Sequence, residues 1–211
     1  MITITVAEAV AQARAFAASP SRTLLGIAGP PGAGKSTLSA AIARAVPEAV
    51  IVPMDGFHLL NEVLVELGRR NRKGAPDTFD VVGYTELLRR LRNQQPGQTV
   101  HGPLYDRALG EPLEDAIAVL GDARLIITEG NYLLHDDHGW QDVRPLLDIV
   151  WYVDVPDDVR VPRLIARHVH FGKLPDAASE WVLRSDEANA RLVHTTRERA
   201  DVAVTLDEFP G

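Results

Sequence analysis

Five short runs of mainly apolar residues recur along the chain without the polar alternation of a half-exposed strand. They cover residues 23–28, 49–54, 124–128, 148–155 and 201–206. Continuous runs of this length are typical of strands that are buried on both faces of a parallel sheet. The pattern therefore predicts the strands of an α/β protein.

Helices are predicted between these strands, because apolar residues recur there every three or four positions and so share one helical face. The faces consist of Leu38, Ala41, Ile42 and Ala45, then Tyr84, Leu87, Leu88 and Leu91, then Trp181, Ser185, Ala188 and Leu192. Pro156 suits the first turn of a further helix. Thr5 and Glu8 fit a capping box, so we expect an N-terminal helix within residues 1–20.

Strands that alternate with helices imply a parallel sheet covered on both faces. We expect a single domain over residues 1–211, an α/β three-layer sandwich with a mainly parallel, doubly wound sheet.

Composition and charge narrow the function classes. The chain has 211 residues, of which 45% are hydrophobic and 24% charged, as in an ordinary globular domain. Its net charge of −7 argues against general nucleic-acid binding. Cysteine is absent, which excludes disulfides, Cys-ligated metals and thiol catalysis, and the seven histidines show no zinc-type spacing. With neither a membrane-spanning run nor a signal peptide, we expect a cytoplasmic protein.

Residues 29–36 read GPPGAGKS and match G-x-x-x-x-G-K-[ST], between a predicted strand and a predicted helix. Glycines let successive backbone N–H groups surround a polyphosphate, and Lys35 supplies a mobile positive charge to its terminal phosphates, a catalytic role. Ser36 can ligate Mg²⁺. The predicted nucleotide-binding residues are Gly29, Pro30, Pro31, Gly32, Ala33, Gly34, Lys35, Ser36 and Thr37.

Two acidic residues follow predicted strands, where ligands collect in doubly wound sheets. Asp55 and Glu129 each end an apolar run, and each is followed by glycine. We expect Asp55 to accept the proton of an attacking hydroxyl, and Glu129 to hold Mg²⁺ with Ser36. The two roles could be shared or exchanged, which makes Asp55 a candidate metal ligand too. The alternative is that one of the acids caps the next helix.

Several segments together resemble one family. They are the glycine-rich loop, Asp55-Gly56-Phe57-His58, Pro76-Asp77-Thr78-Phe79-Asp80, Pro103-Leu104-Tyr105-Asp106-Arg107 and Thr128-Glu129-Gly130-Asn131. Their order resembles the uridine kinase/phosphoribulokinase/type I pantothenate kinase superfamily over about residues 20–207, and most of all its compact bacterial members labelled nucleoside/nucleotide kinase or fructose-transport-system kinase. The resemblance implies a P-loop NTPase fold of the nucleoside/nucleotide kinase type, ATP with Mg²⁺, and a catalytic base at Asp55.

The resemblance also bears on the acceptor. It implies that Asp77 contacts a substrate hydroxyl, and His58, Tyr105 and Arg107 are further candidates for substrate contacts. Alternatively, Asp77 is a turn residue and Arg107 pairs with Asp106 on the surface.

Gly110 and Pro112 stand where uridine kinases carry a His and an Arg that help to read the base. This difference argues against uridine itself as the acceptor.

Residues of about 160–178 are expected to form a helical lid, where the superfamily places one. Arg160, Arg163 and Arg167 share a helical face, and Lys173 follows in a Gly- and Pro-containing turn. We expect Arg163 and Arg167 to neutralise charge on the transferring phosphoryl group. For Arg160 and Lys173, a solvated basic face is an equal alternative.

The leading hypothesis is a kinase that moves the γ-phosphate of ATP onto a hydroxyl of a small metabolite, which could be nucleoside-, sugar- or pantothenate-like. A nucleotide-hydrolysing switch is the alternative, since Asp80-Val81-Val82-Gly83 fits a short D-x-x-G pattern. A P-loop module without turnover is a third class. A homodimer is plausible.

Overall fold

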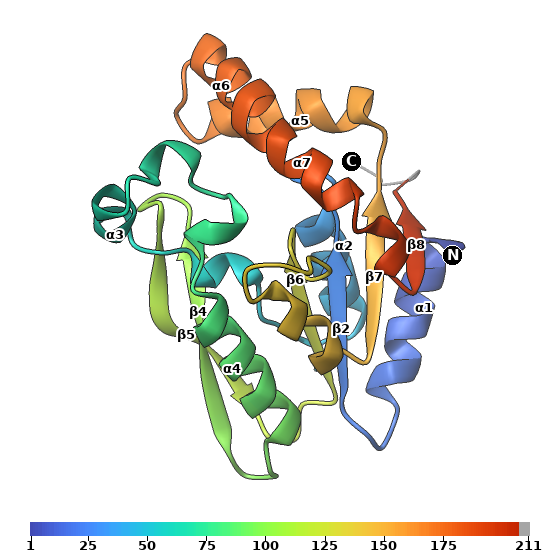
Figure 1. The fold of residues 1–211 in the computed structure, drawn as a ribbon. Helices are drawn as coiled ribbons and strands as arrows, with labels where there is room; N and C mark the ends of the chain where they lie inside the picture. Colours follow the sequence, from blue (N-terminus) through green and yellow to red (C-terminus); the bar gives the residue numbers. More distant parts are fainter. Residues whose placement is uncertain (207–211) are drawn as a thin grey trace.

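Six parallel strands form the central sheet of the computed structural model, which describes residues 1–206 (Figure 1). Their order across the sheet is β1-β8-β7-β2-β6-β3. The strands are β1 (Ile2–Thr5), β2 (Thr23–Ala28), β3 (Val50–Ile51), β6 (Leu125–Gly130), β7 (Ile149–Asp154) and β8 (Val202–Thr205). The predicted α/β fold with a mainly parallel sheet is confirmed.

Helices cover both faces of the sheet because the side chains of each central strand alternate between two cores. Leu24 and Ile126 face a core that includes the apolar side of α4 (Val81–Asn93). Their neighbours Leu25 and Ile127 face a second core, which α1 (Val6–Ala17) and α2 (Lys35–Ala45) complete. The expected sandwich follows from burial on both faces.

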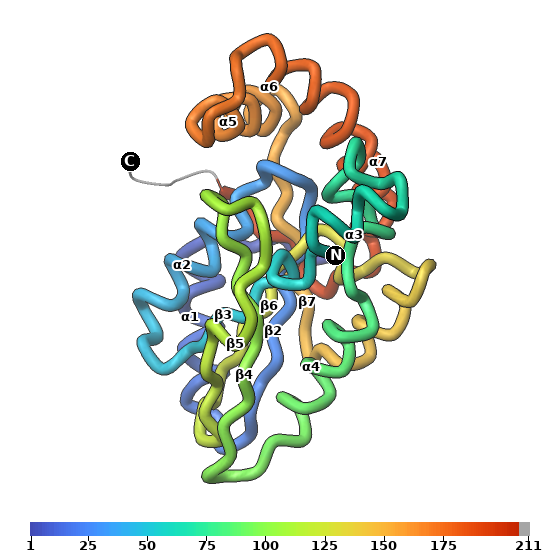
Figure 2. Tube along the Cα trace, turned by 90° about the vertical axis from the view of Figure 1, so that its left-hand side faces the viewer, coloured from blue at the N-terminus to red at the C-terminus, as the bar shows by residue number. Residues whose placement is uncertain are grey.

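The remaining helices lie around the carboxyl ends of the strands. Figure 2 shows α5 and α6 above the end of the sheet at which β2 leads into α2. They are α3 (Asn61–Glu66), α5 (Asp157–His170), α6 (Pro175–Trp181) and α7 (Glu187–His194), with a π-helical turn at Val182–Asp186. Single 3₁₀ turns lie at Met54–Phe57, Arg70–Arg72, Pro76–Thr78, Trp140–Asp142, Arg144–Leu146 and Arg197–Arg199.

An antiparallel hairpin that the sequence pattern did not predict stands beside the sheet. It consists of β4 (Thr99–Asp106) and β5 (Glu111–Leu120), and it packs on α4 and on the 3₁₀ turn at Met54–Phe57. Most of β5 is exposed, and the apolar run at residues 116–120 alternates between exposed and more buried side chains. It presents Tyr105 and Arg107, two candidate substrate residues, at its turn.

Three predicted elements differ from the structure. The expected N-terminal helix is preceded by β1, and its capping box at Thr5 and Glu8 starts α1 at Val6. The strand expected at residues 49–54 ends at Ile51, because Pro53 has no N–H to donate to a neighbouring strand. On the C-terminal helix Ala188 is exposed and Asn189 is buried, since the π-helical turn shifts the buried face.

None of the helices within residues 1–206 combines the length and the apolar character that crossing a membrane requires.

The 3₁₀ turn that carries Asp55 is pressed against the hairpin. A Cβ atom on Gly56 would lie 2.4 Å from the carbonyl oxygen of Pro103. We expect Gly56→Ala to lower the free energy of unfolding by about 1–3 kcal/mol, because backbone would have to move. Chemical denaturation measures the change. Ala188→Ser, on an exposed position of α7, is the control and should change it by less than about 0.5 kcal/mol; equal effects would contradict the prediction.

Candidate active site

The P-loop connects the buried strand β2 to the first turn of α2. Gly32 and Gly34 have φ angles of +79° and +91°, in the left-handed region that favours glycine. A Cβ atom on Gly32 would lie 3.2 Å from the carbonyl oxygen of Arg160 and would crowd α5. These glycines give the loop its curvature, and the helix N-terminus that follows suits an anion.

Lys35 is fixed inside this loop. Its side chain is only 8% exposed, and its Nζ donates to the carbonyl oxygens of Gly29 (2.9 Å) and Pro30 (3.0 Å) and to Oδ1 of Asn131 (2.7 Å). Burial lowers the pKa of Lys35 to about 8. A bound phosphate would take the place of one of these neutral acceptors and stabilise the ammonium form.

Oxygen ligands suited to Mg²⁺ gather next to Lys35. Ser36 Oγ donates to Glu129 Oε1 at 2.7 Å. Burial, and the nearby carboxylate of Asp55, raise the pKa of Glu129. A hydroxyl and two carboxylates that disfavour each other's charge fit the donor set of a hard divalent cation. Ser36, Glu129 and Asp55 could therefore hold Mg²⁺.

Two cavities meet at Asp55. The first, of about 350 Å³, is lined by P-loop and α2 residues that include Lys35, Ser36 and Thr37. The second, of about 330 Å³, lies between the hairpin turn, residues 70–79 and the α5–α6 segment. Both cavities are lined by Asp55, Arg107, Asn131 and Arg167. A phosphoryl group that passes between the cavities would pass these four side chains.

Aromatic rings form one wall of the second cavity. His58 stacks on Phe79 with ring centroids 4.1 Å apart, and Tyr105 lies 4.8 Å from His58. Burial lowers the pKa of His58 to about 4, so the ring is neutral at physiological pH. Arg107 lies 3.7 Å from Asp55. The carboxylate of Asp106 instead accepts from the backbone of its own turn, which removes the alternative that Arg107 pairs with Asp106.

Asp77 is placed differently from the other substrate candidates. Its carboxylate pairs with Arg69 at 3.4 Å and with Arg72, and it lines neither cavity. Burial raises the pKa of Asp77, but the two guanidinium groups outweigh burial and hold the pKa below its usual value. The structure thus gives Asp77 a role in fixing the segment before α4, while a substrate contact through this residue stays a prediction.

The three arginines of α5 have two different environments. Arg163 and Arg167 line the first of the two cavities, called the nucleotide-side cavity from here on. Arg160 is fully buried and donates to the carbonyl oxygen of Pro31 at 3.0 Å and to Glu187 at 2.6 Å. Arg160 is therefore not part of a solvated basic face; it ties the P-loop to α5 and α7.

Sequence reasoning missed several residues of the site, among them Asn131, Lys73 and Arg70. Asn131 holds Lys35 and lines both cavities, and Lys73 lines the second cavity. Asn131 follows Glu129-Gly130 directly, so its position after a buried strand was a usable signal. Lys73 lies in a polar segment whose path no periodicity predicts.

Comparisons with known proteins identify the family of the chain. The Phosphoribulokinase / Uridine kinase family matches residues 24–207. The chain belongs to this family. The Escherichia coli (strain K12) protein YggC is 36% identical over 197 residues, which cover 89% of this chain and 79% of that protein. The uridine kinase of Latilactobacillus sakei subsp. sakei is 31% identical over 185 residues, covering 86% and 84%.

A solved structure is similar over almost the whole chain. It is the crystal structure of a putative fructose transport system kinase from Silicibacter sp. TM1040, with a TM-score of 0.84, 38% identity, and coverage of 95% of this chain and 98% of that one. Together with the family match, these relatives show a small-molecule kinase, a phosphotransferase that acts on a hydroxyl group. Membership of this P-loop kinase family implies the use of ATP, with Mg²⁺ as the typical metal.

We expect Arg160→Met to lower the free energy of unfolding by about 3 kcal/mol, because Glu187 and the carbonyl of Pro31 would lose a buried partner. ATP affinity should fall as well, since the P-loop loses a support. Urea denaturation and calorimetric titration with ATP measure the two effects. Asp157→Ala removes only an exposed partner of Arg160 and should cost less than about 1 kcal/mol; a larger loss than in Arg160→Met would refute this role.

The lowered pKa of Lys35 predicts a pH dependence of nucleotide binding. Lys35 is charged below pH 8 and loses its proton as the pH rises through about 8. ATP affinity should therefore fall about tenfold between pH 7 and pH 9 at constant Mg²⁺. The comparison is with Lys35→Met, in which the titration of the nucleotide itself is the same. If ATP affinity falls with pH equally steeply in the wild-type protein and in Lys35→Met, Lys35 does not supply the titrating charge.

Proposed function

We propose that the protein is an ATP- and Mg²⁺-dependent kinase that transfers the γ-phosphoryl group to a hydroxyl of a nucleoside-, sugar- or pantothenate-like metabolite. The observation that carries the proposal is the meeting of two cavities at Asp55. One cavity is built around the P-loop, as a nucleotide requires, and the other adjoins it at Asp55 and is walled by aromatic rings. A hydrolytic switch has no need for the second cavity.

In this proposal Asp55 accepts the proton of the acceptor hydroxyl while the hydroxyl oxygen bonds to the γ-phosphorus. The bond from that phosphorus to the β,γ-bridging oxygen breaks, and ADP leaves. Lys35, Arg163 and Arg167 are placed around the nucleotide-side cavity to balance the negative charge of the phosphates. Mg²⁺, held by Ser36 and Glu129 with Asp55, would neutralise further phosphate charge.

The lining of the second cavity, called the acceptor-side cavity from here on, supports a compact organic molecule as the phosphate acceptor. His58 and Tyr105 offer ring faces that suit a sugar or a base. Pro112 pairs with Tyr105 in the hairpin, and Gly110 lies in its turn, so neither place offers the side-chain hydrogen bonds that would select uracil. This difference supports an acceptor other than uridine.

The D-x-x-G segment supports a structural role instead of a switch. Asp80 is the N-cap of α4, and its Oδ1 accepts from the backbone N–H of Gly83 at 2.9 Å. This cap accounts for both residues of the pattern without a nucleotide.

Asp55→Asn tests the assignment of the base. We expect kcat to fall by about 10²–10⁴-fold while ATP affinity stays within a few-fold, because a general base acts only in the transfer step. ADP formation is measured with and without added acceptors. Asp122→Asn, on an exposed turn that precedes β6, is the control and should retain full activity. Near-normal turnover in Asp55→Asn would refute the assignment of Asp55 as the general base. ATP hydrolysis that does not depend on an acceptor would refute the kinase function.

A further inference from the structure

The acceptor-side cavity carries an excess of positive charge on a protein whose net charge is −7. Two carboxylates line it, Asp55 and Asp186. The lysines and arginines that line it are Arg70, Lys73, Arg107, Arg167 and Lys173. Arg107 and Arg167 also line the nucleotide-side cavity, whereas the other three face only the acceptor side. The transferring phosphate therefore does not account for Arg70, Lys73 and Lys173.

Both carboxylates of the cavity have other partners. Asp186 lies 2.8 Å from Nε2 of His168, and Asp55 lies 3.7 Å from Arg107. Within residues 1–206, no carboxylate lies within 4 Å of the charged groups of Arg70, Lys73 or Lys173. Glu111 is near enough to Lys73 to raise its pKa, but burial and the charge of Arg70 outweigh this effect. Cations that outnumber the carboxylates around them and form no ion pair with them point to a negatively charged ligand.

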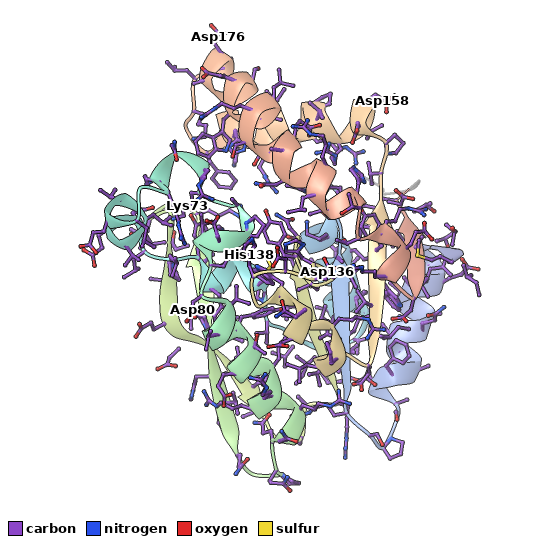
Figure 3. All side chains as sticks on the ribbon, in the orientation of Figure 1. Lys73, Asp80, Asp136, His138, Asp158 and Asp176 are labelled. Atoms are coloured by element: carbon purple, nitrogen blue, oxygen red, sulfur yellow. The ribbon has the colours of Figure 1, made fainter. Side chains whose placement is uncertain are left out.

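Lys73 is positioned for such a ligand. Its Nζ donates to Asn61 Oδ1 at 2.8 Å and to the carbonyl oxygen of Gly110 at 2.7 Å, and an ammonium group has a third N–H to donate. It lies 5.3 Å from the ring centroid of Tyr105. Figure 3 shows Lys73 on the segment below the α5–α6 helices. Burial and the charge of Arg70 lower the pKa of Lys73 to about 8, a cost that a bound anion would offset.

Lysine is rare in this chain. Of the 22 basic residues, three are lysines, namely Lys35, Lys73 and Lys173. Lys35 lines the nucleotide-side cavity, and the other two line the acceptor-side cavity. Lys173 reaches its cavity from the turn between α5 and α6 and lies over Trp181 at 4.8 Å. All three lysine side chains of the chain thus border one of the two cavities.

We propose that the acceptor is itself an anion: it carries a carboxylate or a phosphate monoester in addition to the hydroxyl that is phosphorylated, and Lys73 and Arg70 bind that group, with Lys173 opposite them on the α5–α6 segment. This rests on the proposed kinase function. His58 and Tyr105 then contact the uncharged part of the acceptor. A neutral acceptor would leave the three cations without a partner and would bind more weakly.

Matched acceptors that differ in one charged group test this. The pairs are glycerol with glycerate, panthenol with pantothenate, and ribose with ribose 5-phosphate, each titrated into the protein saturated with Mg²⁺ and a non-hydrolysable ATP analogue. We expect the charged member of at least one pair to bind about tenfold to a hundredfold more tightly than its neutral partner. If the affinities differ in the carboxylate pairs, the cavity binds a carboxylate; if they differ in the phosphate pair, it binds a phosphate monoester.

Variants connect the preference to the cavity. Lys73→Gln and Arg70→Gln should each remove most of the advantage of the charged acceptor, because they lower its affinity far more than that of the neutral one. Lys73→Arg should restore part of the advantage. Lys173→Gln breaks no hydrogen bond recorded within residues 1–206, so it tests the charge even if Lys73→Gln fails to fold. Arg89→Gln, on an exposed position of α4, is the control and should keep the wild-type preference.

The outcomes separate the two proposals. If the ATP analogue does not bind, or if binding does not depend on Lys35, the kinase assignment of the P-loop cavity fails. If the analogue binds but charged and neutral acceptors bind equally, the anionic acceptor is refuted while the kinase stands. If the preference survives in the Arg70→Gln/Lys73→Gln double variant, the assignment of the anion to Arg70 and Lys73 is refuted.

Discussion

The site depends on the register in which β6 pairs with its two neighbours. Ile27 of β2 is paired with Glu129, so this carboxylate lies beside the start of the P-loop and within 2.7 Å of Ser36. On the other side β3 is paired with β6 up to Ile51, and the turn that follows carries Asp55. A slip of one residue would turn Glu129 to the other face of the sheet. Parallel pairing thus assembles acid groups that are 74 residues apart in the sequence.

The sequence was informative wherever a single local cause determines the structure. Continuous apolar runs predicted the buried strands, and the spacing of Gly32, Gly34 and Lys35 predicted the loop between β2 and α2. The hairpin β4–β5 was missed because one side of it is solvent-exposed: in the apolar run at residues 116–120 only Ile117 and Val119 are shielded from solvent. The end of β3 at Ile51 follows from Pro53, a local signal that the apolar pattern concealed.

Long-range partners set the roles that the sequence could not supply. Arg160 and Arg167 share a helical face, yet only Arg160 meets Pro31 and Glu187 from distant segments and becomes buried. Lys73 likewise owes its place in the cavity to hydrogen bonds with Asn61 and Gly110. The overall charge of −7 says nothing of such a local excess of cations, because composition averages over the whole surface.

The hydrogen bonds of Arg160 constrain how the upper helices can move. This one side chain is anchored to the P-loop at Pro31 and to the first residue of α7, Glu187, while it sits in the first turn of α5. The start of α5 and the start of α7, which flank the α5–α6 segment, are therefore held together by this side chain. A closing motion that keeps these hydrogen bonds is a rotation about Arg160. Such a rotation displaces the far ends of α5 and α6 the most and leaves the P-loop in place.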